Sequence, residues 1–512
     1  MAEKLNRSEV LLTKYFEENR LVEPLVKSFN RFIEKELPKI INENKEIVPT
    51  IIPQDVDEFK IRFEKIWVTK PEIIEADGSK RPVYPTEARL RKLSYAAPMY
   101  LEVSAIVNGV QRENFVTQIG NIPIMLNSKF CHLSKLNKNE KIKLGEDPDD
   151  PGGYFIINGT EKTLVIVEDL APNRLIIEKT PTAMVYTGRL FSEKESYKIP
   201  HLFEKHKDGT IFISFTTRIK RLPIIVLIKA LGLDKDSDIS AAVSQVPSDE
   251  LILNLYEQAE VPNQDAAIDF IAKKIGIIQA KEIRVERVNE ILNKYLLPHL
   301  GTTAASKYIK AYNLCKIMKR LIDYSREDKE DDKDHYYNKR LKLPGDLLSD
   351  LFRVNMRVLV SDLLYNFQRI VKRGKTPSVR SIIREKLLTE RIYSAMATGN
   401  WVGSRKGVSQ RTDRVNFLAT QAHLQKVSSP LSASQENFEA RELHPTHMGR
   451  LCIVDTPEGQ NIGLKKNLAM LCSISQDVEE GELIKVLENI GVNLVKPKTP
   501  QVMETQTETG KK

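Results

Sequence analysis

The chain of 512 residues contains few cysteines and no long run of apolar residues. Its four cysteines, Cys131, Cys315, Cys452 and Cys472, never show the Cys-x-x-Cys spacing of common zinc and redox motifs. No apolar run approaches the roughly twenty residues that a membrane-spanning helix needs. These absences predict a soluble, cytoplasmic protein whose thiols are reduced.

Several enzyme motifs are also missing. The chain has no Gly-x-Ser-x-Gly elbow, no phosphate-binding loop and no His-Glu-x-x-His pattern, so a hydrolase would lack a recognisable site. His444 and His447 lie three residues apart with Cys452 nearby. A fourth ligand at suitable spacing is absent, so the sequence predicts no metal site there.

The net charge of +9 is unevenly distributed. From Arg369 to Lys426 there are thirteen basic and three acidic side chains, a surplus larger than that of the whole chain. Basic side chains along a duplex displace condensed counterions, so this run predicts salt-dependent, sequence-independent binding of nucleic acid. A solvated helix face is the ordinary alternative. Only Tyr393, Trp401 and Phe417 are aromatic within it, too few for a groove that stacks successive bases.

The length and the apolar patterns predict three or four compact units of mixed α+β structure. Apolar residues at helical spacing in the first forty positions predict two amphipathic helices, interrupted at Pro24 and Pro38. The alternating run 100–107 ends in Asn108-Gly109, a strong β-hairpin signal. Further expected elements are strands near 174–177 and 211–215, helical runs at 224–233 and 266–324, and a long helix at 347–371.

Two acidic segments resemble cation sites only superficially. Residues 145–153 contain four carboxylates among prolines and glycines, and residues 325–334 mix acidic and basic side chains. Neither has the ordered ligand spacing of a calcium loop. The sequence therefore predicts a solvated turn for the first and a solvated linker for the second.

The segment from His444 to Met470 is the densest in turn chemistry. Three bends are expected around Gly449, Gly459 and Gly463, and Thr456 has the position of a helix N-cap before Pro457. A short strand-like core is expected between the bends, formed by Leu451, Ile453 and Val454. The pattern predicts a rigid platform, either a structural corner or a binding surface.

This segment resembles the fork and active-centre region of the second-largest (B or beta) subunit of cellular DNA-dependent RNA polymerases. The resemblance continues upstream in the same order through 397–401, 407–410, 414–416 and 423–426. Residues 122–129 and 150–162 resemble the protrusion of that subunit. The likeness covers most of the chain and is weakest between about 180 and 325.

The resemblance implies a multidomain α+β fold. A discontinuous protrusion, residues 1–171 and 326–385, would enclose an inserted lobe, residues 172–325. A fork at 386–440 and the start of the external, hybrid-binding region at 441–512 would follow. The function implied is that of a non-autonomous subunit of a nucleotidyltransferase, inactive in isolation, forming one side of the DNA cleft.

The catalytic magnesium motif of the largest subunit is absent from this chain, and the zinc-bearing part of the B subunit would follow it. The resemblance thus implies no cofactor in this chain, with magnesium and zinc in other chains. The inferred splitting of the subunit resembles the B double-prime chain of certain archaea. Expected partners are the B-prime fragment, the largest subunit, other polymerase subunits, template DNA and the transcript. Residues 464–471 and 483–487 are expected to contact the second fragment, and residues 500–512 to be disordered or interface-dependent in an isolated chain.

Nine residues match family positions that contact nucleic acid, and none matches a catalytic position or a metal ligand. Those near the RNA of the hybrid are Gln410, Arg414, His423 and Lys426. Those at the loop where downstream DNA strands separate are Ser404, Arg405 and Lys406. Those in the turn beside the growing RNA are Glu458 and Asn461, although Glu458 could instead cap its own turn.

Two other functions remain compatible with the sequence. A free-standing nucleic-acid-binding module would explain the basic run but not the order of the motifs. A hydrolase would require a site that no motif provides. Nucleic-acid binding by the isolated chain would favour the first alternative, and activity without partners would favour the second.

Overall fold

A computed structural model describes the chain at residues 7–18, 21–53, 56–75, 77–180, 185–195, 197–217, 219–244, 248–277, 279–374, 378–475 and 480–493. Met1–Cys472 form one compact unit, and Ser473–Lys512 form a second unit that contains α16 (Glu480–Asn489). The expectation of disorder for 500–512 lies outside the described residues.

The N-terminal helices are α1 (Arg7–Glu18), α2 (Glu23–Arg31) and α3 (Leu37–Glu43). Pro24 lies in the first turn of α2, where its missing N–H costs nothing. Pro38 does not break the chain into separate helices as predicted. A π-helical turn, Phe32–Glu36, joins α2 to α3 and absorbs the proline, and Leu37 N donates to Phe32 O.

A four-stranded antiparallel sheet follows, in the order β1 (Glu46–Ile47), β2 (Phe59–Val68), β5 (Ala96–Val107) and β6 (Val110–Pro123). Asn108 and Gly109 connect β5 to β6 with φ of +49° and +76°, which confirms the predicted hairpin.

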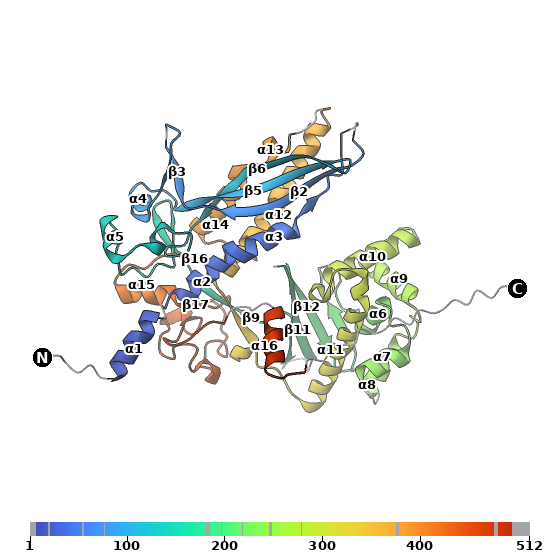
Figure 1. Cartoon of the computed structure of the whole chain (residues 1–512). Coiled ribbons are helices and arrows are strands. Elements are labelled where there is room, and N and C mark those ends of the chain that lie inside the picture. The colour runs from blue at the N-terminus through green and yellow to red at the C-terminus, as the bar shows by residue number, and fades with distance from the viewer. Residues whose placement is uncertain are drawn as a thin grey trace. The chain divides into compact units, whose positions relative to one another are not determined.

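Two later helices pack on this N-terminal part (Figure 1). The long helix α12 (Pro344–Val371), predicted from its apolar pattern, contacts α2, where a Cβ on Gly345 would lie 2.1 Å from Ser28 O. Helix α14 (Glu385–Thr398) packs against β6, where a Cβ on Gly120 would lie 2.9 Å from Thr389 Oγ1. Glycine is therefore required at both contacts.

Two small sheets combine segments that are far apart in sequence. One has the order β16 (Ser409–Arg411), β8 (Thr160–Leu164), β7 (Phe155–Ile157). The other has the order β15 (Lys339–Lys342), β9 (Ile166–Leu170), β17 (Lys426–Ser428), β18 (Lys465–Asn467). Only the β9–β17 pair is parallel. These sheets fix residues 409–467 on the N-terminal part of the chain.

Residues 175–322 share one hydrophobic cluster. Its five-stranded antiparallel sheet has the order β10 (Leu175–Thr180), β11 (Val185–Lys194), β12 (Tyr197–Lys205), β13 (Ile211–Ser214), β14 (Leu222–Pro223). The associated helices are α6 (Ile224–Ala230), α7 (Asp236–Val243), α8 (Asp249–Glu257), α9 (Gln264–Ile275), α10 (Lys281–Tyr295) and α11 (Lys307–Glu327). The run predicted at 266–324 is divided because Gly276 ends α9 and Leu297, at φ +41°, interrupts the chain.

The remaining elements are short: β3 (Glu72–Ile74), β4 (Lys80–Pro82), α4 (Pro85–Leu90), α5 (Lys138–Lys143), α13 (Val379–Ile382) and α15 (Phe417–Leu424). The mixed α+β class predicted from the sequence is confirmed. Among the described residues, no helix is both long enough and apolar enough to cross a bilayer.

The acidic segment at 145–153 is not the solvated turn that was predicted. Glu146 is buried and accepts hydrogen bonds from Thr86 N at 2.5 Å and from the Arg89 guanidinium at 2.9 Å. Asp150 accepts from Tyr154 Oη at 2.9 Å. Glu146 and Asp150 therefore have a structural role, whereas Asp147 and Asp149 are exposed, and the spacing of the carboxylates does not distinguish the two pairs.

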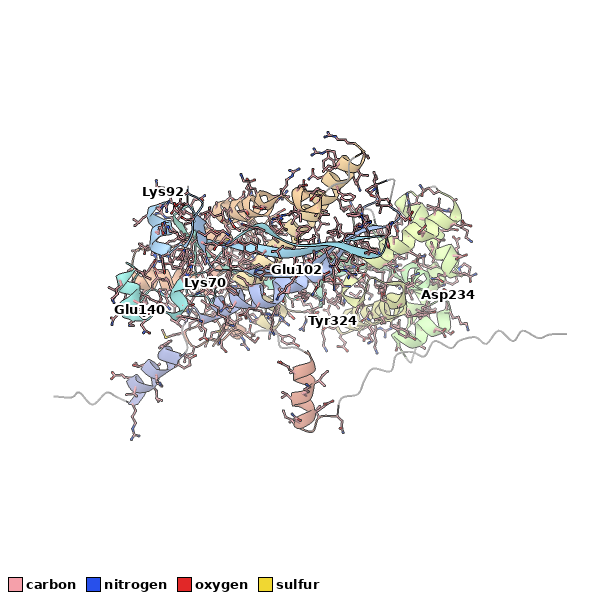
Figure 2. The ribbon with its side chains drawn as sticks, turned by 45° about the horizontal axis from the view of Figure 1, so that its top comes forward. Lys70, Lys92, Glu102, Glu140, Asp234 and Tyr324 are labelled. Atoms are coloured by element: carbon pink, nitrogen blue, oxygen red, sulfur yellow. The ribbon has the colours of Figure 1, made fainter. Side chains whose placement is uncertain are left out.

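The linker at 325–334 is also structured in part. Asp331 N donates to Ile177 O at 2.8 Å, and the Asp331 carboxylate accepts from Ile177 N at 3.0 Å, so the linker pairs with the edge strand β10. Tyr324 of α11, labelled in Figure 2, donates to the same carboxylate at 3.0 Å. The prediction of a solvated linker is wrong at this position.

Candidate nucleic-acid interface

A tight hairpin follows α14. Gly399, at φ +77°, ends the helix, and Trp401 N donates to Arg405 O at 2.8 Å. The Trp401 indole N–H donates to Leu347 O at 2.8 Å, which anchors the hairpin on α12. Ser404 at the tip has φ +59°, a conformation that side-chain-bearing residues adopt mainly in turns.

The three residues predicted to contact downstream DNA differ in this hairpin. Ser404 and Lys406 are exposed, and their side chains bond to no other described residue. Arg405 instead forms an ion pair with the buried carboxylate of Asp169, which Lys198 also approaches at 3.9 Å. Arg405 thus ties the hairpin to β9, while Ser404 and Lys406 remain accessible.

A cavity of about 770 Å³ lies between β16, α15 and the turn that joins β7 to β8. Gln410, Arg414, His423 and Lys426 all line it, so the structure brings together the four residues predicted near the hybrid. The other lining residues are Arg89, Gly159, Thr160, Glu161, Arg411, Thr412, Asp413 and Val415.

Arg414 is held by two carboxylates from the N-terminal part of the chain. Its Nε donates to Glu161 Oε2 at 2.7 Å and its Nη2 to Asp150 Oδ2 at 2.9 Å, and the guanidinium lies 4.8 Å from the Tyr154 ring centroid. Burial raises the pKa of Glu161, but Arg414 and Arg89 outweigh it and hold that pKa below its usual value. Much of the Arg414 charge is therefore neutralised within the chain.

His423 is buried and uses both ring nitrogens. Its Nδ1 accepts from Asp413 N at 3.1 Å, so the proton belongs on Nε2, which lies 3.2 Å from Gln410 Oε1. Burial, assisted by Lys426, lowers the pKa of His423 and favours the neutral ring. Gln410 Nε2 in turn donates to Gly407 O at 3.0 Å. His423 thereby orients Gln410 at the cavity.

Two cations of the cavity have no acidic partner among the described residues. Lys426 begins β17 and was predicted as a contact, whereas Arg411 was counted in the basic run without a role. No ion pair or side-chain hydrogen bond holds either side chain within the described ranges. Arg411 was missed because no motif singles it out from neighbouring basic residues.

The turn that carries Glu458 and Asn461 is fixed by its backbone. Gly459 and Gly463 have φ of +78° and +71°, as the predicted bends require. Gly459–Asn461 form a 3₁₀ turn, and within the described part of the chain neither the Glu458 nor the Asn461 side chain is hydrogen-bonded or ion-paired. Both polar groups are therefore available to a ligand.

Thr456 does not cap this turn as predicted. Its hydroxyl donates to Lys465 O at 3.0 Å and accepts from Gly463 N at 2.9 Å, which closes the base of the loop. The expected apolar core is also wrong in part. Leu451 is buried, but Ile453 and Val454 are 51% and 80% exposed.

A buried polar network supports the platform from beneath. Glu168 on β9 accepts from Lys466 Nζ at 2.9 Å and from Tyr336 Oη at 2.6 Å, and Lys339 Nζ lies 3.5 Å away. Burial raises the pKa of Glu168, but the two ammonium groups outweigh it and hold that pKa below its usual value. His447 packs edge-on against the Tyr336 ring at 5.0 Å.

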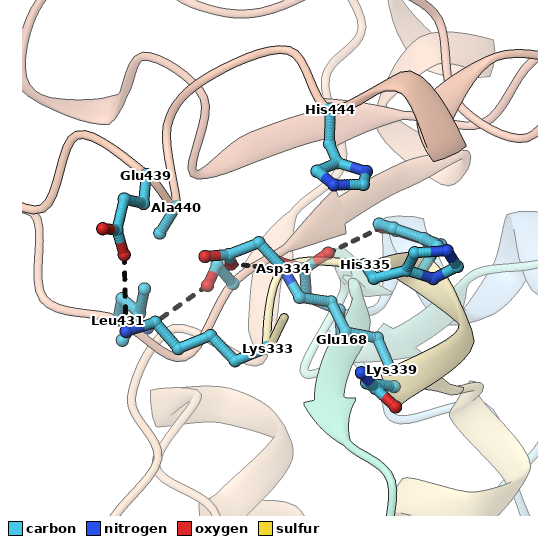
Figure 3. A network of polar contacts seen from close by, with 12 residues as sticks. Glu168, Lys333, Asp334, His335, Lys339, Leu431, Glu439, Ala440 and His444 are labelled. Atoms are coloured by element: carbon cyan, nitrogen blue, oxygen red, sulfur yellow. Dashed lines mark hydrogen bonds and ion pairs between the residues drawn. The ribbon is translucent and has the colours of Figure 1, made fainter. Parts of the chain in front are cut away.

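The same network reaches the linker at 325–334 (Figure 3). His444 Nε2 lies 2.8 Å from Asp332 Oδ2, and Lys333 lies 3.6 Å from Glu178 on β10 and 3.5 Å from Glu439. The linker, the five-stranded sheet and the platform are thus joined through charged side chains. In the described ranges no group of three or more His, Cys, Asp and Glu side chains could hold a metal ion.

The residues predicted to contact a second fragment are only partly accessible. Leu464 and Leu468 are buried because β18 pairs with β17, whereas Met470 and Leu471 are 64% and 61% exposed. In the second unit, the Leu483 side chain is 51% exposed. Nine large apolar side chains between 431 and 471 are exposed: Leu431, Phe438, Leu443, Met448, Ile453, Val454, Ile462, Met470 and Leu471.

Most of the chain matches known RNA polymerase subunits. A family model described as RNA polymerase beta subunit matches residues 20–390, and one described as RNA polymerase Rpb2, domain 3, matches residues 410–474. The chain is 43% identical over 496 residues to DNA-directed RNA polymerase subunit Rpo2N of Methanocaldococcus jannaschii, with 94% of this chain and 99% of the relative covered.

Two further relatives differ in length. Rpo2N of Halobacterium salinarum is 39% identical over 503 residues, which cover 94% of this chain and 95% of the relative. DNA-directed RNA polymerase subunit Rpo2 of Saccharolobus solfataricus is 42% identical over 487 residues, and this chain spans only 43% of it. The resemblance recognised in the sequence is confirmed: the chain belongs to the RNA polymerase beta-subunit family.

Proposed function

We propose that the chain is a non-autonomous subunit of DNA-directed RNA polymerase that forms one side of the DNA cleft and contacts downstream DNA and the RNA–DNA hybrid. The observation that carries the proposal is the cavity lined by Gln410, Arg411 and Lys426, the last two being cations that have no acidic partner among the described residues. Family membership supplies the reaction class, templated nucleotide transfer.

The cavity suits a nucleic-acid backbone rather than a particular base sequence. Arg411 and Lys426 can pair with phosphates, and the second amide hydrogen of Gln410 can bond a sugar or phosphate oxygen. We assign Ser404 and Lys406 to downstream DNA, and Glu458 and Asn461 to the growing RNA. Arg405 holds the hairpin of Ser404 and Lys406 on β9, His423 orients Gln410, and Arg414 fixes the cavity wall through Glu161 and Asp150.

We propose the domain division that the family resemblance implies, and several contacts support it. We assign residues 1–171 and 326–385 to the protrusion, because α12 and β15 return to α2 and β9. Residues 172–325, with their separate hydrophobic cluster, form the lobe. Residues 386–440 form the fork, and 441–512 begin the external, hybrid-binding region.

The exposed apolar residues at 431–471 are proposed to bind a second polymerase fragment that supplies what the longer Rpo2 relatives carry beyond the matched region. Nine large apolar side chains are exposed within about forty residues, and large exposed apolar patches mark protein–protein interaction sites. The largest subunit and the other polymerase subunits complete the assembly. Catalytic magnesium and structural zinc belong to those other chains in this proposal.

A salt series on assembled elongation complexes tests the proposal. The logarithm of transcript-complex stability falls with the logarithm of salt concentration in proportion to the number of neutralised phosphates. We expect Arg411→Gln and Lys426→Gln each to reduce that slope by about one phosphate contact. Arg414→Gln, the matched control, should leave the slope nearly unchanged, because its charge is already paired with Glu161 and Asp150.

The opposite pattern would contradict the assignment. If Arg414→Gln alone lowers the slope, the paired guanidinium must leave its carboxylates to bind a phosphate. If none of the three variants alters the slope or the lifetime of the complex, the cavity does not hold the hybrid.

A further inference from the structure

Arg441 connects two loops of the platform through its side chain. Its Nη1 donates to Gln460 O at 2.7 Å and to Ile462 O at 3.1 Å, and its Nη2 donates to Ala433 O at 2.9 Å and to Gln435 O at 3.1 Å. Two acceptors belong to the turn at 459–462 and two to the loop at 433–435. A planar guanidinium suits this task because its donors diverge in one plane.

These four contacts occupy the four hydrogens on the two Nη atoms. No acidic side chain pairs with Arg441 in the described ranges, so its charge is directed at backbone carbonyl dipoles. A phosphate could approach these donors only by displacing a carbonyl. The geometry therefore separates Arg441 from Arg411 and Lys426, whose donors are not engaged.

The backbone of Arg441 also touches the turn. A Cβ on Gly463 would lie 2.2 Å from Arg441 O, and Gly463 has φ +71°, so the contact requires glycine for both space and conformation. On the other side, Thr456 Oγ1 accepts from Gly463 N at 2.9 Å. The C-terminal side of the turn is thus held from two directions.

The backbone of this turn is held in place, but its polar side chains are not. As described above, Glu458 and Asn461 have no side-chain partners within the described residues, although their backbone neighbours Gln460 and Ile462 are both clamped. A turn ordered before binding loses less conformational entropy when a ligand arrives. This arrangement is expected of a preorganised contact rather than of a structural corner.

We propose that Arg441 is a positioning residue, which holds the 459–462 turn so that Asn461 meets the transcript, without itself binding RNA. The inference rests on the proposed function, which assigns Glu458 and Asn461 to the growing RNA. It adds Arg441, which the sequence motifs did not single out. Arg441 acts on the transcript only by positioning Asn461.

A double-variant cycle in assembled elongation complexes tests the inference. Arg441→Gln and Asn461→Ala should each shorten transcript retention by about tenfold, the size expected for loss of one well-placed hydrogen bond to a charged group. The double variant should be no worse than the more severe single variant, because both act through the same contact. Arg441→Gln should leave the salt slope unchanged, unlike Arg411→Gln.

Arg441→Lys serves as the conservative variant and replaces Arg441→Gln in the cycle if the latter does not assemble. A lysine keeps the charge but cannot span both pairs of carbonyls, so retention should be intermediate. Arg353→Lys is the structural control, since Arg353 is buried and paired with Glu43 at 2.8 Å. Its effect should add to that of Asn461→Ala.

Three results would overturn the inference. A salt slope lowered by about one contact in Arg441→Gln would show direct phosphate binding. Full additivity with Asn461→Ala would show that Arg441 acts independently of this turn. Unchanged retention in Asn461→Ala would remove the contact that Arg441 is said to position, while a reduced slope in Arg411→Gln would leave the proposed function intact.

Discussion

The large apolar side chains of residues 175–322 are mostly buried in one hydrophobic cluster, whereas nine of those between 431 and 471 are exposed. The first region stabilises itself by burying apolar surface around a five-stranded sheet. The second is held by turns, by Arg441 and by the buried Glu168–Lys466 pair. The contrast indicates that the first region is stabilised by its own packing, whereas the exposed apolar side chains of the second are those that we propose to bind the second polymerase fragment.

Breaking the buried ion pair should have the largest effect on stability. Glu168→Ala would leave the Lys466 and Lys339 ammonium groups buried without their shared carboxylate, a change that typically costs about 3–5 kcal/mol. Urea unfolding of the chain measures the loss. The double variant Glu168→Leu/Lys466→Met should lose less, because it also removes the Lys466 charge, and Lys339 keeps Asp334 as a partner at 3.2 Å. An equal loss in both variants would mean that packing, not charge, dominates at this site.

A cavity in the other region should cost somewhat less. Leu314 on α11 is fully buried in the cluster, so Leu314→Ala is expected to lower the free energy of unfolding by about 2–4 kcal/mol. Hydrogen exchange should show the loss as reduced protection of the amides in residues 175–322. Amides of β17 and β18 should keep their protection, and equal loss of protection there would show that the two regions unfold together.

Acid should weaken both regions through one buried histidine in each. Burial lowers the pKa of His447 and of His201 from 6.5 to about 4. Between these values the unfolded chain binds more protons than the folded chain, so stability falls as pH falls from about 6.5 towards 4. Unfolding across this range measures the slope, and His447→Gln should flatten it. His201→Gln should do so only for the transition of residues 175–322, and an unchanged slope in both would contradict the burial argument.

The smallest effect on the isolated chain is expected at the exposed platform. Val454 is 80% exposed, so Val454→Ser should change the free energy of unfolding by no more than about 0.5 kcal/mol. The same variant should reduce recovery of the second polymerase fragment in copurification at high salt. Exposed Ile252 on α8 offers a matched control, with Ile252→Ser retaining full recovery. Normal recovery with Val454→Ser would remove this residue from the interface.

Local signals in the sequence predicted local structure well. The Asn108-Gly109 turn and the helix at 344–371 follow from neighbouring residues alone, so no distant contact was needed to recognise them. Pro38 was misjudged because a π-helical turn, which depends on the packing of its neighbours, absorbs it. Ile453 and Val454 were misjudged because a short apolar run does not reveal whether the folded chain buries its side chains.

Four of the predicted site residues line one cavity, but the sequence did not reveal the contacts that they make within the chain. Family motifs identified Arg414 and Arg405, yet their carboxylate partners lie 253 and 236 residues away in sequence. No local pattern shows that these cations are already paired. Arg411 and Arg441 were missed for a related reason. Whether an arginine is free to bind a ligand, like Arg411, or is held by backbone carbonyls, like Arg441, depends on donors and acceptors that only the fold brings together.

The most direct test is photocrosslinking from the transcript in an assembled elongation complex, with a photoreactive nucleotide placed at successive positions within the hybrid and the attached residues identified by mass spectrometry. The account predicts crosslinks to residues 410–426 and 458–461. Crosslinks confined to residues 172–325, or absent from this chain at every position, would contradict it.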